Sequence, residues 1–280
     1  MFSLIDKARY LNSGVLPALC ISLVLIASGP VSCQRKGTKK ELVVAGSTSI
    51  QPFADRWAEI YMKKYPDKIV NIQGGGSSAG IQAARSGAAD IGMSSRELKA
   101  EERDLAETVV ARDGLAIIIH PGNAISDLSL NQVRQIFAGE LKNWQELGGR
   151  DRAIDVVTRE EGSGTRGAFQ ELVMGKTRIF KGAIVEDSNG TVREIVAGDP
   201  ASIGYISLGL VNEKVKALSL EGIGATDENI LKNHYRLVRP FLFVTNGPVE
   251  GEAKDFIDFV LSAEGQDLII EEGLLPVVQR

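Results

Sequence analysis

Residues 115–121 read Leu-Ala-Ile-Ile-Ile-His-Pro, and residues 236–244 read Arg-Leu-Val-Arg-Pro-Phe-Leu-Phe-Val. Both runs are mostly apolar, without the alternation of a half-exposed strand, which is typical of strands buried on both faces. No proline- or glycine-rich linker divides the chain, so two lobes would have to be joined through strands. We therefore predict that these two strands cross between two lobes.

The rest of the chain alternates apolar strand-like segments with amphipathic helical segments. Further strands are expected at residues 41–45, 68–72, 154–158 and 204–207. Helices are expected at residues 51–65, 79–86, 130–137, 165–173, 191–197 and 251–261. This alternation predicts an α/β fold.

The two crossing strands define the expected domain organisation. The first lobe is discontinuous and comprises residues 41–117 and 240–280, and the second lobe comprises residues 118–239. Two lobes joined by two strands can close over a ligand by a hinge motion. The crossing strands are therefore the predicted hinge.

The first 32 residues have the layout of a secretory signal peptide. Lys7 and Arg9 precede an apolar stretch at residues 15–27, which is short for a membrane span, and small residues follow it up to Cys33. Cleavage before Cys33 removes Cys20, so no intramolecular disulfide can form. We expect an exported protein, in the periplasm or on the extracytoplasmic face of a membrane.

Cys33 resembles the acylated cysteine of bacterial lipoproteins. The polar, basic residues after it suit a tether, so residues 33–40 are expected to be a lipid-anchored segment. Pro30 stands where a leucine is usual in that motif, and ordinary cleavage that leaves a free Cys33 is the alternative. The resemblance implies attachment to the membrane through a lipid on Cys33.

Charge limits the classes of ligand. The 280 residues include 32 Lys and Arg against 36 Asp and Glu, a formal net charge of −4. Nucleic-acid binding normally needs a basic face, and no nucleic-acid partner is expected. A mildly acidic protein gives an anion little long-range attraction, so any anion site must be built from local groups.

Three clusters rich in serine, threonine and glycine each follow a predicted strand and lead into a predicted helix. They lie at residues 46–49, 74–80 and 159–166. At such places, backbone N–H groups, a helix N-terminus and small hydroxyls can point at one anion. Arg159 adds a planar cation suited to a tetrahedral anion, and we expect Glu161 to orient its guanidinium. The clusters together predict an oxyanion site.

Taken singly, the clusters have other interpretations. Residues 46–49 could only cap a helix, and residues 159–166 could be a surface ion pair before a capped helix. Residues 76–80 match G-x-S-x-G, which would make Ser78 the nucleophile of an exported serine hydrolase. The candidate bases are His120 and His234 alone, and His234 has no evident acid partner. We predict a binding protein, with no enzyme activity, cofactor or metal.

Several motifs follow one another in an order that carries a family resemblance. They are Gly46-Ser47-Thr48-Ser49, Gly76-Ser77-Ser78, Ile91-Gly92-Met93-Ser94-Ser95-Arg96, Asp113-Gly114-Leu115-Ala116, Ile136-Phe137-Ala138-Gly139 with Asn143-Trp144, Arg159-x-x-Gly162-Ser163-Gly164-Thr165, and Gly204-Tyr205. Over essentially the whole mature chain, the sequence resembles the phosphate-binding proteins of bacterial high-affinity phosphate ABC transporters. The resemblance implies a two-lobed periplasmic-binding-protein fold of type II. It also implies a monomer that traps inorganic phosphate in its cleft and delivers it to the permease subunits.

The resemblance also implies which residues contact phosphate. Thr48 and Ser49 would bind through hydroxyl and backbone groups, and Ser78 through its hydroxyl and amide. Arg159 would supply the charge. The full expected set is Ser47, Thr48, Ser49, Ser78, Ser95, Asp113, Arg159, Ser163, Gly164 and Thr165, the last three at a helix N-terminus.

Selectivity for phosphate requires an acceptor as well as donors. Phosphate keeps a proton near neutral pH and sulfate does not, so a fixed carboxylate disfavours sulfate. Family members often have an Asp where this chain has Ser95. Our hypothesis is that Asp113 accepts the phosphate proton and that Ser95 is a neutral contact. Sulfate or molybdate is the alternative ligand, for which a site of donors alone is expected.

Arg96 follows Ser95 and is a second cation near the clusters. Arg96 is expected to form a structural ion pair.

Overall fold

The computed structural model describes residues 41–277. The predicted signal peptide, Cys33 and the tether at residues 33–40 lie outside the described residues. Among residues 41–277, no helix combines the length and apolar character that a membrane crossing needs.

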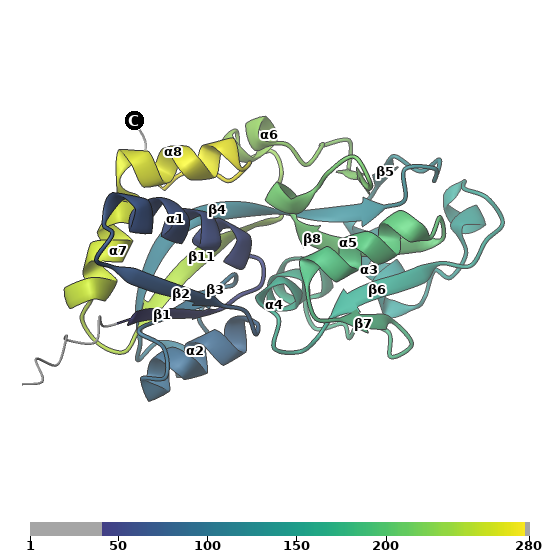
Figure 1. Cartoon of the computed structure of the whole chain (residues 1–280). Helices are drawn as coiled ribbons and strands as arrows, with labels where there is room; N and C mark the ends of the chain where they lie inside the picture. Colours follow the sequence, from purple (N-terminus) through teal and green to yellow (C-terminus); the bar gives the residue numbers. More distant parts are fainter. Residues whose placement is uncertain (1–40, 278–280) are drawn as a thin grey trace, which may run out of the picture. The chain divides into compact units, whose positions relative to one another are not determined.

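One mixed sheet runs through the described chain (Figure 1). Its strand order is β2-β1-β3-β11-β4-β8-β6-β7, with β9 also paired to β4. The strands are β1 (Glu41–Gly46), β2 (Ile69–Gln73), β3 (Ile91–Ser94), β4 (Ala106–Ile119), β6 (Asp155–Arg159), β7 (Ile184–Glu186), β8 (Ser202–Ser207), β9 (Lys216–Ala217) and β11 (Val238–Thr245). A separate small sheet pairs β5 (Asp127–Leu128) with β10 (Ser219–Leu220). Strands at each end of the large sheet are parallel, whereas β4 and β11 pair antiparallel with their neighbours.

Helices connect the strands. They are α1 (Gln51–Lys64), α2 (Ser77–Ser86), α3 (Leu130–Ala138), α4 (Gly164–Phe169), α5 (Asn189–Gly198), α6 (Asp227–Leu231), α7 (Gly251–Leu261) and α8 (Ala263–Glu271). A π-helical turn, Gln170–Met174, continues α4. Short 3₁₀ turns lie at Ala100–Glu102, Trp144–Leu147 and Leu208–Leu210. The predicted α/β class is confirmed.

The two predicted crossing strands are β4 and β11, which pair antiparallel along most of their length. In Figure 1 they run from the region of β1, β2 and β3 to the region of β6, β7 and β8. β4 begins at Ala106, well before the predicted start at Leu115. The first residues of β4 are half-exposed and not uniformly apolar. The apolar run therefore indicates only the buried, later part of this strand.

Hydrophobic residues form separate cores toward the two ends of the crossing strands. One core takes its buried residues from the ranges 42–111 and 241–274. Two others take theirs from residues 115–237, together with Leu275. Residues 41–277 nevertheless belong to one compact unit, because the crossing strands tie these cores together. The exact lobe boundaries stay a prediction.

Candidate anion-binding site

Close backbone packing places the first cluster beside β3. Gly46 ends β1 with a φ of +138°, and a Cβ on it would lie 2.4 Å from the carbonyl oxygen of Met93. The amide of Ser47 donates to the same oxygen at 3.0 Å. A glycine is therefore required here, and it brings the loop at residues 46–49 against the end of β3.

The second and third clusters also touch one another. A Cβ on Gly164 would lie 2.1 Å from the Ser77 hydroxyl and 2.5 Å from the Ser95 hydroxyl. The amide of Ser78 donates to the carbonyl oxygen of Gly162 at 3.1 Å. The N-terminus of α4 therefore lies directly against that of α2, as the oxyanion-site interpretation requires.

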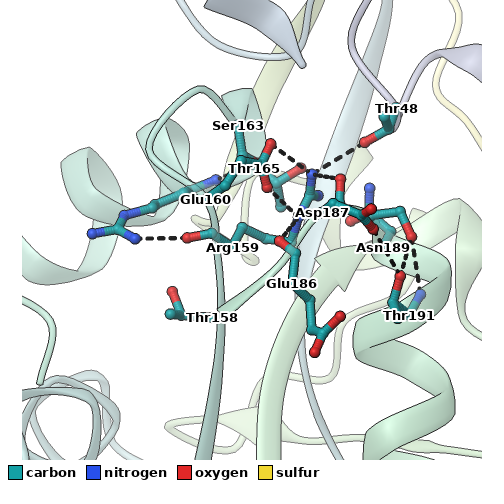
Figure 2. Close-up of polar contacts among 12 residues, drawn as sticks. Thr48, Thr158, Arg159, Glu160, Ser163, Thr165, Glu186, Asp187, Asn189 and Thr191 are labelled. Carbon is teal, nitrogen blue, oxygen red and sulfur yellow. Dashed lines mark hydrogen bonds and ion pairs between the residues drawn. The ribbon is translucent and has the colours of Figure 1, made fainter. Parts of the chain in front are cut away.

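Arg159 is the cation at the centre of these clusters (Figure 2). It is the last residue of β6 and is 1% exposed. Its Nη2 donates to Thr48 Oγ1 at 3.1 Å and to the Asp187 carbonyl at 2.7 Å. Its Nη1 is buried and has no hydrogen-bond partner. A buried guanidinium nitrogen without an acceptor is costly, and an anion at this place would supply one.

Glu160, and not Glu161, orients this guanidinium. Arg159 Nε lies 3.0 Å from Glu160 Oε2, and Arg159 Nη2 lies 3.1 Å from Glu160 Oε1. Glu161 has a side chain that is 93% exposed, and its ion pair is a long one of 3.9 Å with Arg166. A turn closed by the Ser163 amide and the Glu160 carbonyl folds Glu160 back and sends Glu161 outward. The prediction for Glu161 is therefore corrected to Glu160.

Burial and charge act in opposite directions on this ion pair. Burial raises the pKa of Glu160, and the Arg159 guanidinium lowers it. Burial likewise lowers the pKa of Arg159, and Glu160 opposes that change. The pair leaves Arg159 cationic, since its ordinary pKa lies far above neutral.

The first turn of α4 offers further donors. Ser163 caps the helix, because its hydroxyl accepts from the Arg166 amide at 3.2 Å. The amides of Gly164 and Thr165 belong to the first turn, where no acceptor exists within the helix. Figure 2 shows Ser163 and Thr165 on the side of the Arg159 guanidinium.

Three hydroxyls around Arg159 are arranged to donate. Thr48 accepts from the Arg159 guanidinium, Ser78 accepts from Arg96 Nη2 at 3.4 Å, and Ser163 accepts from a backbone amide. Each of these partners can only donate, so each hydroxyl keeps its own hydrogen for a ligand. The described site is thus a set of donors, which suits an anion.

Ser47, Ser49 and Ser95 lie deeper in the site. The Ser47 hydroxyl donates to Ser95 at 2.8 Å, and the Ser95 amide donates to the Ser77 hydroxyl at 3.0 Å. Ser49 Oγ lies 2.6 Å from Thr165 Oγ1 and is also contacted by Asn189. All six of these side chains are buried. No local pattern indicates Asn189, which is the first residue of α5.

Asp113 faces Arg239 across the crossing strands. Its Oδ2 lies 2.9 Å from Arg239 Nε and 2.8 Å from Arg239 Nη2, and its Oδ1 accepts from Ser207 Oγ at 2.8 Å. Burial raises the pKa of Asp113, and the Arg239 charge lowers it.

These contacts occupy both oxygens of the Asp113 carboxylate. A carboxylate has about four acceptor positions, and two contacts from Arg239 and one from Ser207 occupy three of them. The hypothesis that Asp113 accepts the phosphate proton does not fit this geometry. The arginine that takes the carboxylate is 126 residues away in sequence, and no local pattern indicates it.

Arg96 forms the expected structural ion pair. Its Nη1 and Nη2 lie 2.7 Å and 2.8 Å from the two Glu102 oxygens, and both side chains are buried. The Arg96 guanidinium lowers the pKa of Glu102. Arg96 is therefore paired with a buried carboxylate, whereas the carboxylate that pairs with Arg159 is partly exposed.

The geometry gives the serine-hydrolase alternative no base. The Ser78 hydroxyl is contacted by Arg96, and His120 Nδ1 accepts from the Gly122 amide. His234 lines a different cavity of about 500 Å³ with Leu130. Within residues 41–277, no group of three or more His, Cys, Asp and Glu side chains is placed to hold a metal ion.

The fold and the donor set define a binding protein for a small anion in the periplasmic-binding-protein class. Residues 32–264 match the model of a PBP superfamily domain. Among curated relatives, the phosphate-binding protein PstS of Bacillus subtilis is 35% identical over 253 residues, which cover 86% of this chain and 83% of that protein. PstS of Borreliella burgdorferi is 33% identical and covers 88% and 93%. The chain belongs to the PstS family of phosphate ABC transporter substrate-binding proteins.

Solved structures agree with this assignment. A putative phosphate ABC transporter substrate-binding protein from Clostridium perfringens, with bound phosphate, is 43% identical, with a TM-score of 0.83 over 85% of this chain and 100% of that one. An ABC-type phosphate transport receptor from Vibrio cholerae is 37% identical, with a TM-score of 0.72 over 85% of this chain and 100% of that one. The predicted family and the two-lobed fold are confirmed.

Proposed function

We propose that this protein binds inorganic phosphate between its two lobes and delivers it to the permease of a phosphate ABC transporter. The observation that carries the proposal is the buried Nη1 of Arg159, which has no partner within the described chain. The donors around it are those that a tetrahedral anion needs. The names of the relatives and the phosphate held by the Clostridium perfringens protein support phosphate as the ligand.

The proposed site takes donors from both lobes. Thr48 and Ser78 belong to the first lobe, and Arg159, Ser163 and the first amides of α4 belong to the second. An anion would complete the hydrogen bonds only when the two sets approach, so binding shifts the population toward the closed form. The closed form would then be the one that the permease recognises.

Location and assembly complete the proposal. We place the protein outside the cytoplasm as a monomer, held to the membrane by a lipid on Cys33, with residues 1–32 removed. We also propose residues 41–117 and 240–280 as one lobe and residues 118–239 as the other. The separate hydrophobic cores toward the two ends of β4 and β11 support this division.

The other candidates have less support. A site made of donors does not by itself distinguish phosphate from sulfate or molybdate, and the family assignment favours phosphate. The relatives are named as phosphate-binding proteins and not as hydrolases, and neither histidine contacts Ser78.

Isothermal titration of the mature protein with phosphate, arsenate, sulfate and molybdate tests the proposal. Phosphate and arsenate share their charge and protonation states, so we expect both to bind and phosphate to bind more tightly than sulfate. Sulfate binding as tight as phosphate binding, at low and at physiological ionic strength, would reject phosphate as the specific ligand.

A further inference from the structure

Ser49 makes several polar contacts with other residues of the protein. Its Oγ is contacted by Thr165 Oγ1 at 2.6 Å, by Asn189 Nδ2 at 2.8 Å and by Arg239 Nη2 at 3.3 Å. Its amide donates to the Ser47 hydroxyl at 3.2 Å. Distances alone leave open whether Ser49 or Thr165 donates in the short contact between them.

The remaining contacts decide this direction. The amide of Ser207 donates to Asn189 Oδ1 at 3.2 Å, and a backbone amide can only donate. The Asn189 oxygen is thereby fixed on Ser207, so its NH₂ group donates to Ser49. Arg239 also can only donate, so Ser49 Oγ accepts two hydrogen bonds.

A serine hydroxyl has two acceptor positions and one hydrogen. Since Asn189 and Arg239 occupy the acceptor positions, the hydrogen of Ser49 must go to Thr165 Oγ1. The Thr165 hydroxyl then accepts from Ser49 and keeps its own hydrogen. Thr165 thereby joins Thr48, Ser78 and Ser163 as a hydroxyl with its hydrogen free to donate.

We infer that Ser49 is a positioning residue, which Asn189 and Arg239 hold so that the Thr165 hydroxyl donates to the bound oxyanion. The hydroxyl hydrogen and both acceptor positions of Ser49 are used within the protein, so its side chain does not contact the ligand. This differs from the role that the family resemblance implies for Ser49. The inference rests on the proposed function, because it concerns the same anion.

The arrangement has a chemical consequence for the ligand. Thr165 and the first amides of α4 belong to the same helical turn, and all of them donate. An oxygen of phosphate that carries a proton would meet only donors there. Thr165 therefore receives an unprotonated oxygen, and the phosphate proton faces another part of the site.

A double-mutant cycle tests the inference by titration with inorganic phosphate. Thr165→Val keeps the shape and removes the donor, and we expect about 10- to 100-fold weaker binding, the effect of one hydrogen bond to a charged group. Ser49→Ala frees the Thr165 hydroxyl to rotate, for an expected loss of roughly 3- to 10-fold. The double variant should bind like Thr165→Val alone, because Ser49 acts only through Thr165. Thr165→Ser, which keeps the hydroxyl, should restore most of the affinity.

A second variant probes the direction of the hydrogen bonds. Asn189→Asp has nearly the same shape but accepts at both oxygens, so the Ser49 hydrogen turns toward it and Thr165 must donate to Ser49. Gly190→Asp is the matched charge control, because a Cβ there approaches only Ser188 Oγ, at 3.7 Å. We expect Asn189→Asp to weaken phosphate binding about tenfold more than Gly190→Asp does, and this excess to vanish in the Thr165→Val background.

The outcomes separate the inference from the proposed function. Losses for Ser49→Ala and Thr165→Val that multiply in the double variant would overturn the inference, since Ser49 would then contact the anion itself. Equal losses for Asn189→Asp and Gly190→Asp would overturn it as well, even if Ser49→Ala failed to fold. No phosphate binding by the unsubstituted protein would instead reject the proposed function, and the inference with it.

Discussion

Arg159 and Arg239 are both buried, but their guanidinium groups have very different partners. Arg239, on β11, directs its guanidinium at Asp113, the Ser95 carbonyl and Ser49. Arg159, at the end of β6, shares its guanidinium with a partly exposed glutamate and leaves Nη1 without a partner. Both side chains are only 1% exposed.

This difference separates a structural cation from one that serves a ligand. A guanidinium whose three nitrogens all have partners, as in Arg239, stabilises the network around it. A guanidinium with a buried free donor carries an unfavourable free energy that a bound anion relieves. The same residue type therefore indicates opposite roles, and only its partners distinguish them.

Removing the partner of Arg239 should have the largest effect, and it should fall on folding. Asp113→Asn leaves a buried guanidinium without its counter-charge, for which we expect a loss of about 3–5 kcal/mol in the free energy of unfolding. Urea unfolding without phosphate measures it. The ratio of phosphate to sulfate affinity should stay unchanged in the folded protein, whereas a changed ratio would restore Asp113 as the proton acceptor.

Replacing Arg159 should have the opposite result, with the main loss in phosphate affinity and not in the free energy of unfolding. Arg159→Met deletes the charge but keeps the length, and we expect phosphate affinity to fall by about 2–5 kcal/mol, the range for truncating one partner of a buried charge pair. The unfolding free energy without phosphate should change little or rise, because an unmatched buried donor disappears. Arg178→Met, at an exposed arginine, removes the same charge and should leave both quantities unchanged. A large loss of stability with affinity retained would show that the two arginines have the same role.

Much of the fold could be predicted from local patterns. The runs at residues 115–121 and 236–244 located the crossing strands because they are apolar throughout, and the predicted helices are all present within one to two residues at their starts and four at their ends. β3 and α8 were not predicted. β3 has four residues, too few for a periodic signal, and α8 follows α7 after a single residue, Ser262.

The site was predictable only as far as its motifs are local. Residues 46–49, 74–80 and 159–166 do converge, because each is a strand-to-helix turn of the same α/β fold. The partners of these residues were not predictable, since Asp113 with Arg239, and Ser49 with Asn189, meet only in the folded chain. The choice between Glu160 and Glu161 was not predictable either, although they are adjacent in sequence. The turn at these residues determines which carboxylate contacts Arg159.

A smaller effect is expected where the two lobes touch. Gly164→Ala places a methyl group where the Ser77 and Ser95 hydroxyls lie within 2.5 Å, so the two helix N-termini cannot approach fully. Overpacking of this kind costs about 1–3 kcal/mol, and we expect it mainly in phosphate affinity, because an open form can avoid the clash. Gly198→Ala, at a position with nothing within 4 Å of the added Cβ, is the matched control. An unchanged phosphate affinity for Gly164→Ala would mean that this contact is absent from the loaded form.

The smallest effect is expected at Glu160, and its sign tests how Arg159 is held. The carbonyls of Glu186 and Asp187 also fix the Arg159 guanidinium, at 3.1 Å and 2.7 Å, so Glu160→Gln should leave it in place. The substitution removes a negative charge that faces the anion, and since Glu160 is one-third exposed we expect phosphate binding to strengthen by less than about fivefold. Glu161→Gln, at a carboxylate that points into solvent, should leave the affinity unchanged. Binding weakened more than tenfold by Glu160→Gln would show instead that the carboxylate is needed to aim Arg159, and that the free Nη1 depends on it.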